Sequence, residues 1–176
     1  MNRILVAAFI IVACNVVFGQ TKEEIQSSNE RIEKIQKLEM PKSTSVASLD
    51  ELNVTLGNAA LESASITPLL KGLYYRSVGE SADGIVDVTV KKPTLEECKE
   101  LAARILTQVK VVQGISSLLP SVASDAKEIK NPLKLAKVAS SLSYVKTAVS
   151  VLGEETMFQS KAINTIIQTL TSSGNL

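Results

Sequence analysis

The sequence contains no histidine and no tryptophan, and it has only three phenylalanines and three tyrosines. Without histidine there is no imidazole general base, no histidine-based catalytic triad and no histidine-ligated metal site. With so few aromatic rings, the chain lacks the stacking platforms typical of proteins that bind sugars or single-stranded nucleic acid. These absences disfavour many enzymatic and nucleic-acid-binding functions.

Familiar catalytic and cofactor-binding motifs are also missing. The sequence has no Gly-rich phosphate loop, no Cys-x-x-Cys pair, no calcium loop and no Gly-x-Ser-x-Gly turn. A pair of carboxylates would suffice for glycoside chemistry, but the acidic residues cluster at predicted helix starts and on polar faces. We therefore expect no enzymatic activity, no catalytic residue, no cofactor and no bound metal.

The first nineteen residues have the layout of a secretory signal peptide. Arg3 precedes an apolar run from Ile4 to Phe18, and the chain turns polar at Gln20. We expect cleavage after Gly19 and export to the periplasm or the extracellular space. Loss of Arg3 leaves a formally neutral chain, which has no overall field to attract nucleic acid or an anionic membrane.

Two alternatives to simple cleavage remain open. Ile11-Val12-Ala13-Cys14 resembles a bacterial lipobox, so Cys14 is a candidate for lipidation that would anchor the protein to a membrane. An uncleaved anchor is less favoured, because the apolar run is shorter than the ~20 residues of a spanning helix.

Cleavage after Gly19 would leave Cys98 as the only thiol, which excludes an internal disulfide bond. Stability must then come from packing. Cys98 lies within an apolar stripe and is interpreted as a small buried hydrophobic residue.

The remaining chain divides into residues 20–47, a charged amphipathic helix followed by a linker, and residues 48–176, a mainly α-helical bundle. The pattern Ser48 to Glu51 predicts a capping box at the start of a helix, and Thr67-Pro68 predicts a second helix start. Ile85 to Val90 alternates with period two, which predicts one short extended or β segment over 85–91. Residues 74–78 are its candidate partner in a small hairpin.

The helical signal is clearest over the bundle core, residues 94–171. Thr94 and Glu97 form a second capping-box pattern, and the helix that follows is expected to end near Gly114. A short helix is predicted over 122–130, and Asn131-Pro132 opens a longer one. Gly153 is expected to end that helix as a C-cap, with Glu154 and Glu155 starting the last helix.

The longer helix carries a heptad stripe, which predicts either a core seam of an antiparallel bundle or a partner-binding seam. We favour the bundle. The stripe comprises Leu135, Val138, Leu142, Val145, Val149 and Leu152.

Three weaker patterns have simpler explanations. Asn53-Val54-Thr55 is a glycosylation sequon, relevant only in a eukaryote. Lysines 127, 130, 134 and 137 resemble a basic stripe for anionic lipid but are better explained as a solvated face. The small polar residues near the stripe are best explained by close helix packing. They are Ser140, Ser141, Ser143, Thr147 and Ser150.

The function favoured by the sequence is that of an exported, non-enzymatic helical protein that contacts a protein partner. The alternative is a carrier of a lipid or other apolar ligand, or a bundle that binds a membrane surface. An enclosed apolar cavity would favour the carrier, whereas a closed core with exposed apolar surface would favour the partner.

Overall fold

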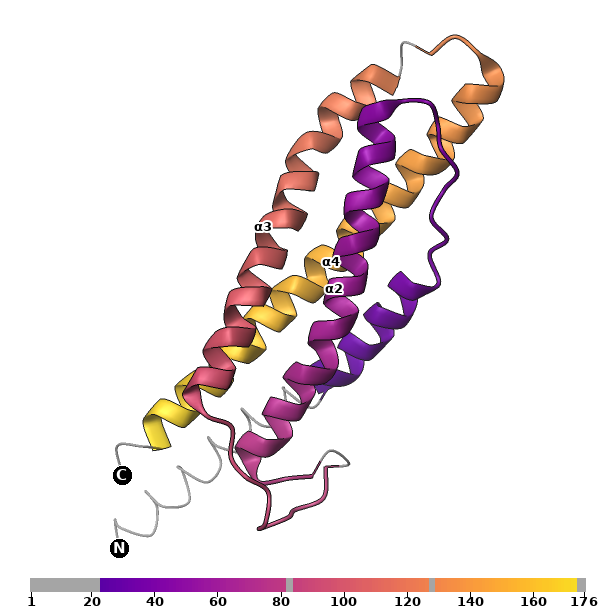
Figure 1. Cartoon of the computed structure of the whole chain (residues 1–176). Coiled ribbons are helices and arrows are strands. Elements are labelled where there is room, and N and C mark those ends of the chain that lie inside the picture. Colours follow the sequence, from indigo (N-terminus) through magenta and orange to yellow (C-terminus); the bar gives the residue numbers. More distant parts are fainter. Residues whose placement is uncertain (1–22, 82–83, 127–128, 174–176) are drawn as a thin grey trace, which may run out of the picture.

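The computed structural model describes residues 23–81, 84–126 and 129–173. The predicted signal peptide and Cys14 lie outside these residues. Within them the chain forms an all-α bundle of four packed helices without a strand. They are an N-terminal helical segment (residues 23–36), α2 (Ala47–Val78), α3 (Leu95–Asp125) and α4 (Pro132–Ser173). Successive helices run in opposite directions (Figure 1).

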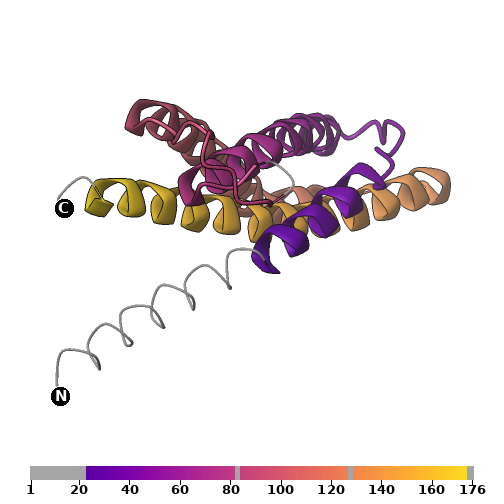
Figure 2. The same cartoon turned by 90° about the horizontal axis from the view of Figure 1, so that it is seen from below.

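The long helices α2 and α4 form the middle of the bundle. The helix α3 packs against both of them, and the N-terminal segment lies on the other side of the α2–α4 pair (Figure 2). The segment is held there by Ile25, Ile32 and Ile35, whose side chains are buried in the core. The predicted amphipathic helix therefore belongs to the bundle rather than lying loosely attached to it.

The α helices are longer and fewer than the sequence predicted. Pro68 and Pro120 lie inside α2 and α3, and α3 passes through Gly114. Gly153 lies inside α4, so the predicted C-cap and the new helix start at Glu154 and Glu155 are wrong. A glycine costs a helix interior about 1 kcal/mol and a proline about 3 kcal/mol. Apolar residues packed on both sides of each break outweigh these costs.

The two predicted capping boxes had different outcomes. At α3 the prediction is confirmed, because Thr94 Oγ1 accepts from Glu97 N (3.1 Å) while Glu97 Oε2 accepts from Thr94 N (2.6 Å). At α2 the predicted capping box is wrong, because the N-cap residue is Val46 and its side chain makes no capping hydrogen bond. Instead Asp50 accepts hydrogen bonds from the preceding loop, at Thr44 N (2.8 Å) and Ser43 Oγ (2.6 Å).

The β segment predicted over 85–91 is absent among the described residues. Only an isolated bridge joins Glu80 and Val86, and residues 88–89 form a turn. The expected hairpin partner, residues 74–78, is the last turn of α2. Because no neighbouring strand is available, a β-branched pattern alone does not make a strand here.

The core consists of two apolar clusters, one toward each end of the bundle. The cluster nearer the α3–α4 connection includes most of the heptad stripe, with Val138, Val145 and Leu152 buried and Leu142 and Val149 packed against it. This confirms the core-seam interpretation, although Leu135 is about half exposed. The other cluster contains Cys98, which is fully buried as predicted, and burial raises the pKa of its thiol.

Candidate functional site

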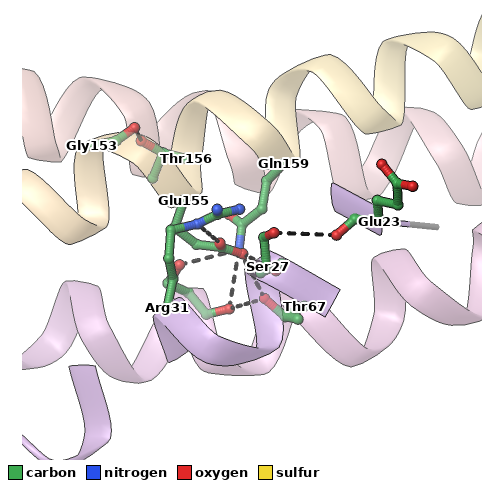
Figure 3. Close-up of polar contacts among 10 residues, drawn as sticks. Glu23, Ser27, Arg31, Thr67, Gly153, Glu155, Thr156 and Gln159 are labelled. Carbon is green, nitrogen blue, oxygen red and sulfur yellow. Dashed lines mark hydrogen bonds and ion pairs between the residues drawn. The ribbon is translucent and has the colours of Figure 1, made fainter. Parts of the chain in front are cut away.

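A belt of buried polar side chains separates the two apolar clusters, and Glu155 of α4 is its centre. The Glu155 side chain has no solvent exposure. Arg31 Nε of the N-terminal segment donates to Glu155 Oε2 (2.8 Å), and Ser28 Oγ donates to Oε1 (2.5 Å). Thr67 Oγ1 of α2 donates to the same Oε1 (3.0 Å). The carboxylate therefore ties three helices together (Figure 3).

Gln159 extends this belt by one turn of α4. Its Nε2 lies within hydrogen-bond distance of Ser63 O (3.2 Å), Ser63 Oγ (3.1 Å), Thr67 Oγ1 (3.1 Å) and Glu155 Oε1 (3.2 Å). Gln108 of α3 is also buried and donates through Nε2 to the carbonyl of Ala59. Every helix of the described bundle thus contributes a polar side chain to the belt.

The position of the belt follows from the sequence of each helix. The apolar clusters meet between Ala59 and Ile66 on α2, between Ile105 and Val112 on α3, and between Leu152 and Phe158 on α4. Burying a charge is costly unless it is paired and hydrogen-bonded, so an alignment of the helices that moved Arg31 or Thr67 away from Glu155 would be penalised. We infer that the belt fixes the register of the bundle.

The surroundings of Glu155 also limit its chemistry. Arg31 bonds to the carboxylate and lies over the Phe158 ring, with Cζ 5.3 Å from the ring centroid. The carboxylate oxygens accept from groups of the protein itself and have no exposure to solvent. A general base must reach its substrate directly or through one water molecule, and this geometry does not provide that contact.

The sequence interpretation missed this belt because it treated Glu154 and Glu155 as a helix start. A signal was nevertheless present. Positions 155 and 159 continue the stripe of Leu152, Phe158 and Ala162 at helical spacing, which places both polar residues on the core-facing side. Ser28 and Ser63 interrupt the apolar stripes of their own helices in the same way.

Asn53 and Ser141 form a second buried polar contact between α2 and α4. Asn53 Nδ2 donates to Ser141 Oγ (2.7 Å), and both residues are buried. The Asn53 amide is therefore not accessible to a glycosylating enzyme in the folded protein. Ser141 bonds across the helix pair rather than back to its own helix. Ser140, Ser143 and Ser150 are exposed, and Thr147 is partly buried.

The lysines singled out by the sequence are exposed where the structure describes them. Lys130, Lys134 and Lys137 are exposed around the start of α4, and Lys127 lies outside the described residues. Leu133 is 81% exposed among them and Leu135 is 49% exposed.

A surface groove between α2 and α3 is the second candidate site. Its volume is about 370 Å³. Its rim carries two ion-paired arginines: Arg76 reaches both oxygens of Glu97 (3.0 and 3.1 Å), and Arg104 Nε donates to Glu62 Oε1 (3.0 Å). The lining residues are Pro68, Leu69, Gly72, Leu73, Arg76, Glu97, Glu100, Leu101 and Arg104.

The groove combines an apolar floor with fixed charges at its edges. Leu69 is 48% exposed, and a Cβ added at Gly72 would meet no atom within 4 Å. The Arg76 guanidinium and the backbone of Thr94 hold the pKa of Glu97 at about 2, against an ordinary value of 4.5. Glu97 therefore stays ionised, and the ion pair persists, over the neutral and mildly acidic range.

Within the described ranges, no three His, Cys, Asp or Glu side chains gather where they could hold a metal ion. The helices in those ranges also include none with the length and hydropathy needed to cross a bilayer. No protein family model, curated protein or solved structure matches the chain.

Proposed function

We propose that the protein is an exported, non-enzymatic helical bundle that binds a protein partner along the α2–α3 groove. Export is supported by the leader sequence, and a non-enzymatic role by the absence of histidine and the enclosed position of Glu155. The partner would lay an apolar side chain against Leu69 and Gly72. Its charged groups would meet Arg104 and Glu100 at the rim.

The observation that carries this proposal is the contrast between the buried polar belt and the open groove. The belt residues bond to one another inside the bundle, whereas the groove leaves Leu69 half exposed beside the open space at Gly72. A concave apolar surface with a few fixed polar groups is typical of binding sites. Arginine is among the residues that contribute most to protein interfaces.

Carriage of a lipid or another apolar ligand is supported less well. A carrier needs an enclosed apolar cavity of several hundred Å³. The α2–α3 groove opens to the surface, and so does a second groove lined by residues that include Met40, Gly57 and Tyr144. The polar belt also crosses the bundle at mid-length, where an acyl chain lying along the axis would have to displace Glu155 and its partners.

Photo-crosslinking in the source cells tests the proposal. A photoreactive residue in place of Leu69 is expected to give one discrete protein adduct, and the same residue in place of the exposed Ser150 on α4 is not. In the Leu69-probe background, Gly72→Gln would place a side chain in the groove from a Cβ that meets no atom within 4 Å, and it should abolish the adduct.

Gly153→Gln is the matched control, because Gly153 is also a helix-interior glycine with no atom within 4 Å of an added Cβ. This variant should keep the adduct. Equal adducts from positions 69 and 150, or an adduct that survives Gly72→Gln, would exclude the groove as the binding site.

A further inference from the structure

The connection between α2 and α3 exposes a cluster of aliphatic side chains at one end of the bundle. Ile85 is 67% exposed, Val86 76% and Val88 97%. Lys91 and Lys92, further along the same connection after Thr89 and Val90, are also exposed. Adjacent apolar side chains held in water are unfavourable, so such a cluster indicates a contact surface.

The backbone of this loop is held in place by the bundle. Asp87 N donates to Gly79 O (3.0 Å), and Ser81 N donates to Ile85 O (2.8 Å). Arg76 Nε donates to Lys91 O (3.0 Å) while its guanidinium pairs with Glu97. The apolar side chains are therefore presented by a fixed loop and are not buried against the helices.

The loop lies in the half of the molecule where the described chain begins. Ile25, near the start of the N-terminal segment, packs in the same apolar cluster as Leu73 and Tyr74 at the end of α2. The α3–α4 connection lies at the opposite end (Figure 1). The sequence that precedes residue 23 holds the apolar leader and Cys14. If Cys14 is lipidated, residues 15–22 span at most about 30 Å between the lipid and the bundle.

We infer that this end of the bundle rests on a lipid bilayer, with Ile85, Val86 and Val88 inserted at the boundary between headgroups and acyl chains. Lys91 and Lys92 would lie at the level of the headgroups, where an aliphatic stem and a charged tip are both accommodated. A lipid surface fits better than a protein because the cluster is purely aliphatic and protrudes. Protein hot spots favour Trp, Tyr and Arg in well-packed pockets.

If Cys14 is lipidated, the three inserted side chains add a second contact to a protein that its N-terminus already holds at the membrane. One acyl chain gives only marginal binding, and stable attachment takes two signals. Glu80 and Asp87 lie on the same loop, so the charge of this surface is mixed and insertion should depend on the aliphatic residues more than on anionic lipid.

Fluorescence on vesicles tests the inference. Residues 20–176 with an N-terminal polyhistidine tag would be tethered to phosphatidylcholine vesicles through a chelating lipid. Val88→Cys is labelled with an environment-sensitive dye, while Cys98 is fully buried and protected. We expect a blue shift on tethering and loss of emission when the acyl chains are brominated.

Leu133→Cys is the matched control, because Leu133 is an equally prominent aliphatic residue (81% exposed) near the α3–α4 connection. Its label should keep its aqueous emission in both kinds of vesicle. A label at Val86→Cys should behave as at position 88 and should lose its blue shift when Ile85 and Val88 are changed to Asp. Aqueous emission from positions 86 and 88 on tethered protein would overturn the inference. The α2–α3 partner proposal would stand in that case, since it depends on a different surface.

Discussion

Glu155 illustrates how a single buried charge constrains a helical bundle. Its carboxylate is fully enclosed, and among the described residues its cationic partner is Arg31 on the N-terminal segment. Breaking a buried ion pair by removing one partner costs about 3–5 kcal/mol, because the other charge stays buried and uncompensated. Replacing both partners by apolar residues of similar volume removes that penalty.

Arg31→Met is therefore expected to lower the free energy of unfolding by about 3–5 kcal/mol, and the double variant Arg31→Met, Glu155→Met should recover much of the loss. Urea unfolding measured by circular dichroism checks both. Lys37→Met is the control, since Lys37 pairs with Glu33 on the exposed surface and should change stability by less than about 0.5 kcal/mol. A loss for Arg31→Met no larger than for Lys37→Met would show that Glu155 does not need its partner.

The lowered pKa of Glu97 predicts that the stability of the protein depends on pH. Its pKa in the folded protein is about 2, below the ordinary 4.5, so its contribution is complete above pH 4.5 and is lost as the pH falls toward 2. We expect Glu97→Gln to reduce stability at neutral pH and to lose less stability than the wild type between about pH 5 and about pH 2.5. Urea midpoints across that range test this. Parallel pH curves for the two proteins would contradict the assignment of the shift to Glu97.

Among the elements, Gly72 inside α2 and Gly153 inside α4 are places where the helix is weakened without a steric reason. An added Cβ at Gly72 or Gly153 meets nothing within 4 Å. Replacing such a glycine by alanine lowers the conformational entropy of the unfolded chain and favours the helix.

Gly72→Ala and Gly153→Ala should each raise the free energy of unfolding by about 0.5–1 kcal/mol. Gly79→Ala is the contrasting variant, because Gly79 caps α2 with φ +73° and alanine there is strained. Thermal melts of the three proteins give the comparison. Destabilisation by Gly72→Ala would indicate a constraint that its open surroundings do not explain.

Local patterns in the sequence predicted where helices form better than where they end. The Thr94 capping box, the buried Cys98 and the core stripe through Val145 and Leu152 are confirmed. The breaks expected at Pro68 and Gly153 are wrong, because helix ends depend on tertiary packing on both sides of the weak residue. The extended segment over 85–91 failed for a related reason, since a strand needs a partner from elsewhere in the chain.

On the scale of the whole molecule, the two apolar clusters are built from the same four helices. The N-terminal segment, α2, α3 and α4 each place residues in both clusters. The polar belt lies between the clusters and joins the helices at mid-length. Each cluster needs side chains from all four helices of the described bundle. The two halves of the bundle should therefore unfold together.

Tyrosine fluorescence can test this cooperativity, because Tyr74 lies in one cluster and Tyr144 packs against the other. Variants that keep only one of these tyrosines, with the others changed to Phe, should give coincident urea midpoints within each protein when followed by fluorescence and by circular dichroism. A Tyr144 signal that changes well before the helical signal would show that the half near the α3–α4 connection unfolds independently.

The sequence by itself determined the helical class of the described bundle, the start of α3 and most of the apolar core, because each of these depends on spacing along one helix. Only the tertiary structure decided that Glu155 is buried, that Arg31 neutralises it and that the bundle is divided by a polar belt. A glutamate beside another glutamate has the same local pattern at a helix start and inside a core. The difference lies in which side chains other helices bring to it, and that is set by the alignment of residues more than 80 positions apart in the chain.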